Sequence, residues 1–116
     1  FCSISLSDLL TPWHQIEKRI ISAAEGDFVL AIFNPKSLKR DWQLKKAVDL
    51  LLEFRKPSTP VAIARQLGRP EENIEIYTLE SLPFNKVDML TLLVVGNSQS
   101  IVNNNKFLTP RGYFMD

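Results

Sequence analysis

The feature that most constrains the fold is the apolar run LTLLVV at residues 90–95, which ends abruptly in GNSQS. Four consecutive aliphatic residues at 92–95 cannot lie on one solvated face, so they predict a strand covered on both sides. Gly96 permits a turn or a close approach of the main chain, and Asn97 and Ser98 place short polar groups just past the strand. Two interpretations stay open: a loop that borders a ligand, because ligands often lie beyond strand ends in open α/β sheets, or a cap for a following helix.

Composition narrows the class of protein. The chain has 116 residues, 45% of them hydrophobic and 23% charged, as is typical of one globular domain with a sizeable core. A net charge of +1 argues against a general binder of nucleic acid or of other polyanions. The single cysteine, Cys2, excludes an internal disulfide, and no CxxC motif or Cys/His pair suits zinc. Because the chain also lacks a charged leader and an apolar run of roughly 18 residues, we expect a cytoplasmic protein without a membrane span or a metal.

Apolar residues at three- and four-residue spacing predict two amphipathic helices. The first begins with Thr11 as N-cap and Pro12 at the first helical position, and it ends at Gly26 in a left-handed conformation. The second spans residues 37–55. The residues expected on the inner faces are Trp13, Ile16, Ile20 and Ala24 in the first helix and Leu44, Val48, Leu51 and Phe54 in the second.

Five strands are expected, at residues 2–6, 27–33, 61–67, 72–79 and 90–95. The resulting order β-α-β-α-β-β-β predicts an α/β fold, in which helices pack on a five-stranded mixed sheet that includes a late antiparallel hairpin. Such a chain supplies its own core, so we expect it to fold alone. Its strand-like start, FCSISL, lacks a methionine and predicts a piece of a longer polypeptide.

Residues suited to acid–base or nucleophilic catalysis are sparse. His14, the only histidine, is predicted on the solvated side of the first helix, and no nucleophile motif accompanies it. Glu71 and Glu72 are adjacent on a turn and diverge, which does not suit a glycosidase-like pair of carboxylates. No catalytic residue is assigned from these patterns.

Basic residues gather at two places. Lys36, Lys39 and Arg40 lie where the second strand meets the long helix. They form either a solvated first turn or part of an anion site at the helix N-terminus, where the helix dipole itself favours anions. Near the end of the chain, the segment TPRG at 109–112 predicts a tight turn that presents Arg111.

Five segments, in this order and spacing, resemble the C-terminal half of the precorrin-3B C17-methyltransferase family: SISLSDLLTPW, FNPKSLKR, TPVAIARQLGRPEE, VDMLTLLVVGNSQS and TPRGY. That family belongs to the S-adenosylmethionine-dependent tetrapyrrole methylases of cobalamin biosynthesis. The resemblance covers essentially the whole chain. The sequence departs from the family at Leu67, where a small residue is expected before Gly68, and at His14, where glutamate is usual.

The resemblance implies a two-domain enzyme whose cofactor lies between a first domain with a glycine-rich loop and a second domain. The four glycines here are too dispersed for such a loop, so residues 1–116 are expected to be the C-terminal domain and one wall of the site. By resemblance, the residues that line S-adenosylmethionine are Phe33, Asn34 and Ala62, with Leu90 and Thr91 as weaker candidates. Those expected to bind the carboxylate arms of a tetrapyrrole are Arg111, Arg40, Lys36 and Arg69, in that order.

In this family a methyl group passes from a sulfonium to a ring carbon of a polycarboxylated macrocycle, and ring contraction accompanies the transfer. Positioning is expected to dominate such a reaction, and no general base is assigned. The resemblance also implies that the intact protein is a homodimer. Two alternatives stay open: another tetrapyrrole methylase of the superfamily, and a non-enzymatic dimerisation or ligand-binding module that reuses the fold.

Overall fold

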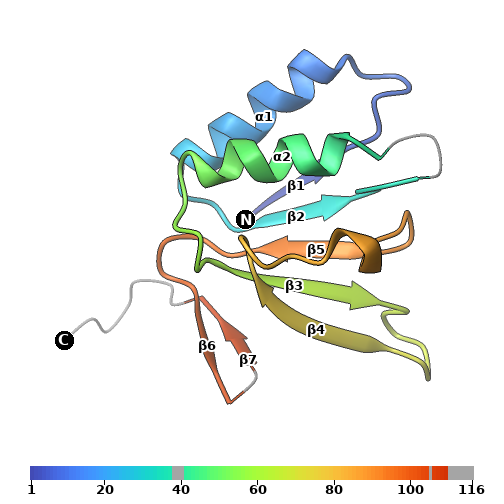
Figure 1. The fold of residues 1–116 in the computed structure, drawn as a ribbon, viewed down its shortest axis with the longest axis vertical. Helices are drawn as coiled ribbons and strands as arrows, with labels where there is room; N and C mark the ends of the chain where they lie inside the picture. The colour runs from blue at the N-terminus through green and yellow to red at the C-terminus, as the bar shows by residue number, and fades with distance from the viewer. Residues whose placement is uncertain (38–40, 105, 110–116) are drawn as a thin grey trace.

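The computed structural model of the chain describes residues 1–37, 41–104 and 106–109. Within these ranges it has a five-stranded mixed sheet, two α-helices, a short 3₁₀-helix and a two-stranded hairpin (Figure 1), which confirms the predicted α/β class. The elements are β1 (Cys2–Ser5), α1 (Trp13–Glu25), β2 (Leu30–Phe33), α2 (Gln43–Leu52), β3 (Pro60–Arg65), β4 (Asn73–Thr78), η1 (Phe84–Lys86), β5 (Leu92–Val95), β6 (Ile101–Asn103) and β7 (Lys106–Leu108).

The strand order in the sheet is β1-β2-β5-β3-β4. β1 is parallel to β2, whereas β5 lies between β2 and β3 and is antiparallel to both. β4 completes the sheet as an antiparallel partner of β3. The ends of β1, β2 and β3 therefore meet the beginnings of β4 and β5 at one end of the sheet, on the right in Figure 1.

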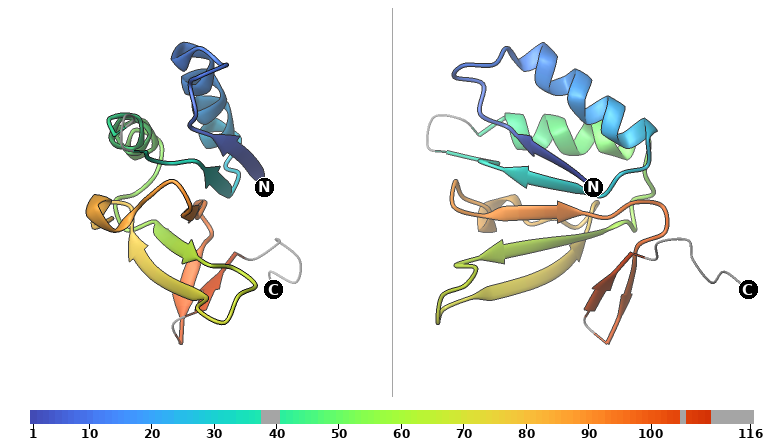
Figure 2. Two further views of the ribbon diagram at one scale, coloured as in Figure 1. Left: turned by 90° about the vertical axis from the view of Figure 1, so that its right-hand side faces the viewer. Right: turned by 180° about the vertical axis from the view of Figure 1, so that it is seen from behind.

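Both α-helices cover the same face of the sheet (Figure 2) and close the core there. The stripe predicted on α1 is confirmed at Ile16, Ile20 and Ala24, which are all buried. Each large aliphatic side chain buried in this way contributes about 1.5–3 kcal/mol relative to an exposed one. The strand residues that face the helices are Ile4, Leu30, Ile32, Val61, Ile63, Leu93 and Val95.

The opposite face of the sheet carries no helix among the residues described (Figure 2). Leu93 and Val95 are buried against the helices, but Leu92 and Val94 point the other way and are only half-buried. The prediction that residues 92–95 are covered on both sides is therefore wrong for one side. The strand is apolar on both faces, although the described chain covers its second face only in part.

Both ends of α1 differ from the prediction. Pro12, and not Thr11, is the N-cap residue, and no side chain caps the helix. Gly26 has a right-handed φ of −78°, whereas the next residue, Asp27, has a φ of 57°. Aspartate tolerates the left-handed region better than most residues, so the chain reverses there one position later than predicted.

α2 is shorter than the predicted helix at 37–55. Leu44, Val48 and Leu51 are buried as expected, but Phe54 lies beyond the helix and is 44% exposed. The N–H groups of Phe54 and Arg55 both donate to the carbonyl of Leu51, and this tightening ends the helix and turns Phe54 to the surface. Lys39 and Arg40 lie outside the described residues.

The chain after β5 forms a hairpin of β6 and β7, which projects away from the sheet (Figure 1). No helix follows β5 in the part of the chain that the structure covers, so the helix-cap interpretation of Gly96, Asn97 and Ser98 is wrong. Gly96 is needed for a different reason. A side chain at Gly96 would lie 2.6 Å from the side chain of Ser100, which closes the turn into β6.

Candidate functional site

Most of the predicted site residues gather at one end of the sheet. We call it the site end and define it by residues 33–37, 65–69 and 88–92, where β2 and β3 end and β5 begins. A left-handed residue follows each of the two ending strands: Asn34 has a φ of 50° and Gln66 a φ of 54°. Non-glycine residues in this conformation are strained and concentrate at functional sites.

A self-contained turn at the site end holds Leu90 out from the surface. The Asp88 carboxylate accepts hydrogen bonds from the Leu90 N–H (2.9 Å) and the Thr91 hydroxyl (3.0 Å). In return, the Asp88 N–H donates to the Thr91 hydroxyl (3.1 Å). Thr91 is buried, whereas Leu90 is 82% exposed. The turn therefore fixes an apolar side chain in solvent. Exposing this apolar surface to water is unfavourable, and contact with a ligand or another domain would remove it from water.

Two cavities flank this turn, and Asp88 and Leu90 line both. The apolar cavity has a volume of about 410 Å³ and the arginine cavity about 300 Å³. The other lining residues are Lys36, Ser37, Val87 and Met89 in the apolar cavity and Arg65, Gln66, Leu67 and Arg69 in the arginine cavity.

The structure brings Phe33, Asn34, Leu90 and Thr91 together at the site end, with Ala62 farther along β3. Phe33 is exposed, and the Asn34 side-chain amide donates to the Ser5 hydroxyl at 3.0 Å. These are the five residues predicted to line the cofactor.

Ala62 lies on the helix-free face, between Val94 and Ile76 of the neighbouring strands. Its neighbours Val61 and Ile63 point into the core on the other face, because side chains alternate along a strand. Ala62 itself is only 8% exposed, with the larger Val94 and Ile76 on either side of it.

The predicted carboxylate-binding residues are only partly described. Arg69 is exposed and lines the arginine cavity. Lys36 lines the apolar cavity, and its ammonium group donates to the Phe84 carbonyl at 3.2 Å. Arg40 and Arg111 lie outside the described residues.

Sequence reasoning missed Arg65. It is the last residue of β3, it lines the arginine cavity beside Arg69, and its Nε is buried without a hydrogen-bond partner in the structure. A buried guanidinium nitrogen without a partner costs free energy unless a ligand or water satisfies it. The signal in the sequence was an arginine that directly follows four apolar residues of the strand and precedes the turn at Gly68.

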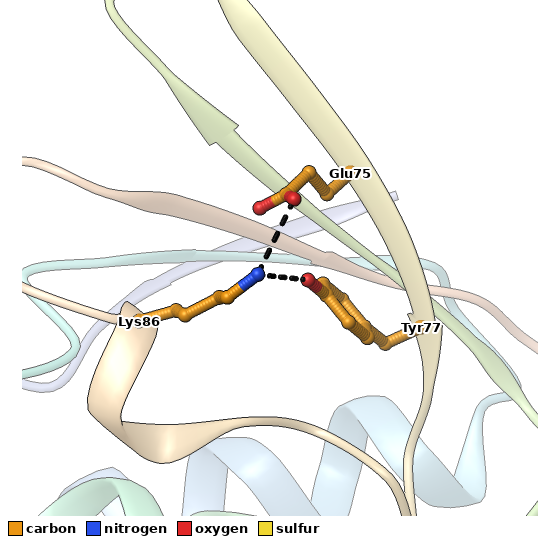
Figure 3. Close-up of polar contacts among 3 residues, drawn as sticks. All are labelled: Glu75, Tyr77 and Lys86. Atoms are coloured by element: carbon orange, nitrogen blue, oxygen red, sulfur yellow. Dashed lines mark hydrogen bonds and ion pairs between the residues drawn. The ribbon is translucent and has the colours of Figure 1, made fainter.

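η1, which leads into this turn, is fastened to the sheet by Lys86. Figure 3 shows its ammonium group donating to the Tyr77 hydroxyl (3.0 Å) and approaching a Glu75 carboxylate oxygen (3.5 Å). The hydrogen bond to Tyr77 and the charge of Glu75 raise the pKa of Lys86 above its usual value. This contact anchors the segment that carries the site-end turn to β4.

The opposite end of the sheet is tied by polar contacts. We call it the clamp end and define it by residues 23–28, 54–60 and 96–100. The Arg55 guanidinium donates to the carbonyls of Gly96 (2.6 Å), Phe28 (2.8 Å) and Ala23 (3.4 Å). Arg55 thereby joins the loops before β2 and after β5.

Asp27 adds a second tie at the clamp end. Its carboxylate accepts hydrogen bonds from the Ser98 N–H (2.9 Å) and the Ser98 hydroxyl (2.5 Å). The Ser98 hydroxyl, then the Ser98 N–H, and the charge of Arg55 together lower the pKa of Asp27. Because β5 is antiparallel to β2, the loop of Gly96, Asn97 and Ser98 lies at the end of the sheet opposite Phe33, Asn34 and Leu90.

Other kinds of site find little support. Among the described residues, no three His, Cys, Asp or Glu side chains come together to hold a metal ion. His14 is exposed, as predicted. In the ranges that the structure covers, no helix is both long and apolar enough to span a bilayer.

Comparisons with known proteins now decide the family. No protein-family model matches the chain. A probable cobalt-factor III C17-methyltransferase of Salmonella typhimurium is 47% identical over 113 residues, which cover 97% of this chain and 47% of the relative. A precorrin-3B C17-methyltransferase of Sinorhizobium is 43% identical over 86% of this chain and 39% of the relative. The crystal structure of the methyltransferase CobJ superposes with a TM-score of 0.89 at 35% identity, over 95% of this chain and 46% of CobJ.

The chain belongs to the C17-methyltransferase family. This confirms the resemblance that the five sequence segments carry. The chain spans about half the length of these relatives, or less.

Proposed function

We propose that residues 1–116 are the C-terminal domain of a two-domain methyltransferase that methylates C17 of precorrin-3B, with ring contraction, in cobalamin biosynthesis. The observation that carries the proposal is the exposure of Leu90. A hydrogen-bonded turn holds this side chain 82% exposed, between the apolar cavity and the arginine cavity. A large apolar side chain held in solvent by its own turn is placed for contact with a ligand or a second wall. The relatives, about twice as long as this chain, have room for that wall.

S-adenosylmethionine fits the site end. The apolar cavity offers Val87, Met89 and Leu90 to its apolar parts, and a volume of about 410 Å³ suits a small molecule. Of the five residues that the resemblance assigns to the cofactor, Leu90 lines this cavity, and Phe33, Asn34, Ala62 and Thr91 would contact parts of the cofactor that extend beyond it. When bound, its sulfonium supplies a methyl group to a nucleophilic carbon.

The arginine cavity suits the carboxylate arms of a tetrapyrrole. Arg69 is exposed at its rim, and Arg65 lines it as well. Guanidinium groups bind carboxylates through paired hydrogen bonds, so these residues would fix the macrocycle beside the methyl donor. Lys36, Arg40 and Arg111 complete the set that the family resemblance assigns to substrate.

The residues described here would act by binding and orientation. The Asp88 carboxylate is engaged by Leu90 and Thr91, which leaves it a structural role in the turn. Holding two reactants in line can supply much of the rate acceleration of a transfer reaction. We further propose that the intact protein is a cytoplasmic homodimer in which an N-terminal domain forms the other wall of the cofactor site.

The test compares Leu90→Asp with Leu108→Asp, an equally polar change at an exposed position of β7, in the full-length polypeptide that carries this chain. We expect Leu90→Asp alone to abolish S-adenosylmethionine binding by calorimetry and methyl transfer to precorrin-3B, with the melting temperature unchanged. Normal cofactor binding by Leu90→Asp would contradict the assigned wall. Transfer to a different tetrapyrrole, and not to precorrin-3B, would favour another methylase of the superfamily. An intact protein that neither binds the cofactor nor transfers a methyl group would favour the non-enzymatic module.

A further inference from the structure

The clamp end holds a polar cavity of about 500 Å³ between the loop before β3 and the loop after β5. We propose that this cavity binds the phosphate group of a small molecule. The residues that carry the inference are Arg55, Lys56, Ser58, Thr59 and Gln99, which all line it.

Arg55 gives the cavity a buried positive charge. It is 6% exposed, and its three hydrogen bonds all go to main-chain carbonyls. Among the described residues, no carboxylate lies within ion-pair distance of its guanidinium group. Neutral carbonyls accept three hydrogen bonds from the guanidinium group, but none of them forms an ion pair with its charge, and arginine stays protonated even when buried.

The nearest acid does not pair directly with Arg55. The charge of Asp27 acts on Arg55 from beyond ion-pair distance, and both carboxylate oxygens of Asp27 are bonded to Ser98. No acidic side chain lines the cavity. In this respect it differs from both cavities at the site end, which include Asp88. An anion is therefore the ligand that the cavity's charge favours.

Four other lining groups have donors to spare. Among the described residues, no partner forms a hydrogen bond with the Lys56 ammonium, the Ser58 and Thr59 hydroxyls or the Gln99 side-chain amide. Thr59 is only 6% exposed, so its hydroxyl has little access to bulk solvent other than through this cavity. Phosphate oxygens accept several hydrogen bonds at once, which matches a cation with hydroxyl and amide donors around it.

The cavity walls are held in place before any ligand arrives. The Asn97 N–H donates to the Ser100 hydroxyl (2.9 Å) and the Gln99 N–H to the Asn97 side-chain oxygen (2.9 Å). The Gly96 N–H donates to the Pro60 carbonyl (2.8 Å), which joins the two loops. A preformed wall saves the entropy that a ligand would otherwise lose in ordering it.

Titration of the full-length polypeptide with inorganic phosphate at constant ionic strength tests the proposal, with acetate and chloride as comparison anions. Lys56→Gln and Thr59→Val should each weaken phosphate binding by about tenfold, the loss expected for one hydrogen bond to a charged ligand. Lys46→Gln is the matched control, because it removes the same charge from an exposed position of α2 outside the cavity. It should leave the affinity unchanged.

The proposal is overturned if phosphate binds no better than acetate or chloride, or if Lys46→Gln weakens binding as much as Lys56→Gln. Melting temperatures identify a variant that has lost its fold. If Thr59→Val is destabilised, Ser58→Ala takes its place, because Ser58 is exposed and has no hydrogen bond to lose. An unchanged affinity in Ser58→Ala together with an unchanged affinity in Lys56→Gln also contradicts the site.

Discussion

The two ends of the sheet use their side chains in opposite ways. At the clamp end, the buried Arg55 and the carboxylate of Asp27 tie loops that are distant in sequence. At the site end, the polar groups of Asp88 and Thr91 bond only within their own turn, and the turn leaves Leu90 in solvent. The described chain itself ties the loops at the clamp end, whereas the site end leaves a large apolar side chain free to contact a ligand or another domain.

Replacing Arg55 should produce the largest loss of stability. Arg55→Met keeps most of the apolar stem but removes the donor to the carbonyls of Phe28 and Gly96, whereas the Ala23 carbonyl keeps the N–H of Phe28. Each buried carbonyl left unsatisfied costs about 1–3 kcal/mol, so we expect a loss of roughly 3 kcal/mol or more in the free energy of unfolding, measured with urea. Arg69→Met, at the exposed rim of the site end, should change it by less than about 0.5 kcal/mol. Equal effects would erase the contrast between the two ends.

Filling the space above Ala62 should affect binding far more than folding. Ala62→Leu extends from the helix-free face, so its cost in stability should stay below about 1 kcal/mol, less than for overpacking a closed core. If that space receives S-adenosylmethionine, the affinity of the full-length protein should fall by about a hundredfold or more, equivalent to roughly 2.7 kcal/mol. Calorimetric titration measures the affinity, and thermal melting measures the cost in stability.

The matched control is Ala47→Leu. Ala47 is fully buried on the side of α2 that faces the core, where a larger side chain should cost about 1–3 kcal/mol. If Ala62→Leu is as destabilised as Ala47→Leu and still binds the cofactor normally, the assignment of Ala62 to the cofactor site is wrong, and Ala62 is instead a packing residue.

The turn at the site end should be worth less than the clamp. Thr91→Val keeps the shape of a buried side chain but removes the hydroxyl that bonds both ways with Asp88. We expect a loss of about 1–2 kcal/mol, because the Asp88 N–H and carboxylate can partly turn to water. Asn85→Ala, an exposed substitution in η1, serves as the control. No change in Thr91→Val would mean that the turn does not fix Leu90.

The sequence predicted the elements well because their signals are local. Ile16, Ile20 and Ala24 repeat within one helix, and each strand needs only a few apolar neighbours to be recognised. Helix ends were less predictable. Gly26 and Asp27 can both adopt the left-handed conformation that reverses the chain, and the sequence alone did not show that Asp27 adopts it. Five sequence segments were also enough to predict the family.

The arrangement of the strands could not be read locally, and the site depends on it. The antiparallel insertion of β5 between β2 and β3 places Leu90 at the same end of the sheet as Phe33, and the loop at Gly96 at the other end. Arg55 drew no attention in the sequence because its partners are 27 to 41 residues away. Arg65 was overlooked for a similar reason, since its cavity is completed by Asp88 and Leu90 from another loop.

The smallest effect should come from Asp27, and it should depend on pH. Hydrogen bonds from Ser98 lower the pKa of Asp27 below its ordinary value of 3.8. A folded-state pKa below the unfolded one stabilises the fold fully above the unfolded value, and this contribution is lost as the pH falls through the folded value. Asp27→Asn tolerates the same left-handed backbone but lacks the charge, so wild type should exceed it by about 0.5 kcal/mol near neutral pH, a small figure because the carboxylate is exposed to solvent. The difference should shrink below roughly pH 4, as urea unfolding at a series of pH values would measure. Glu25→Gln, a nearby exposed carboxylate, should show no such trend, and a difference that persists unchanged into acid would mean that the Asp27 charge adds nothing to the clamp.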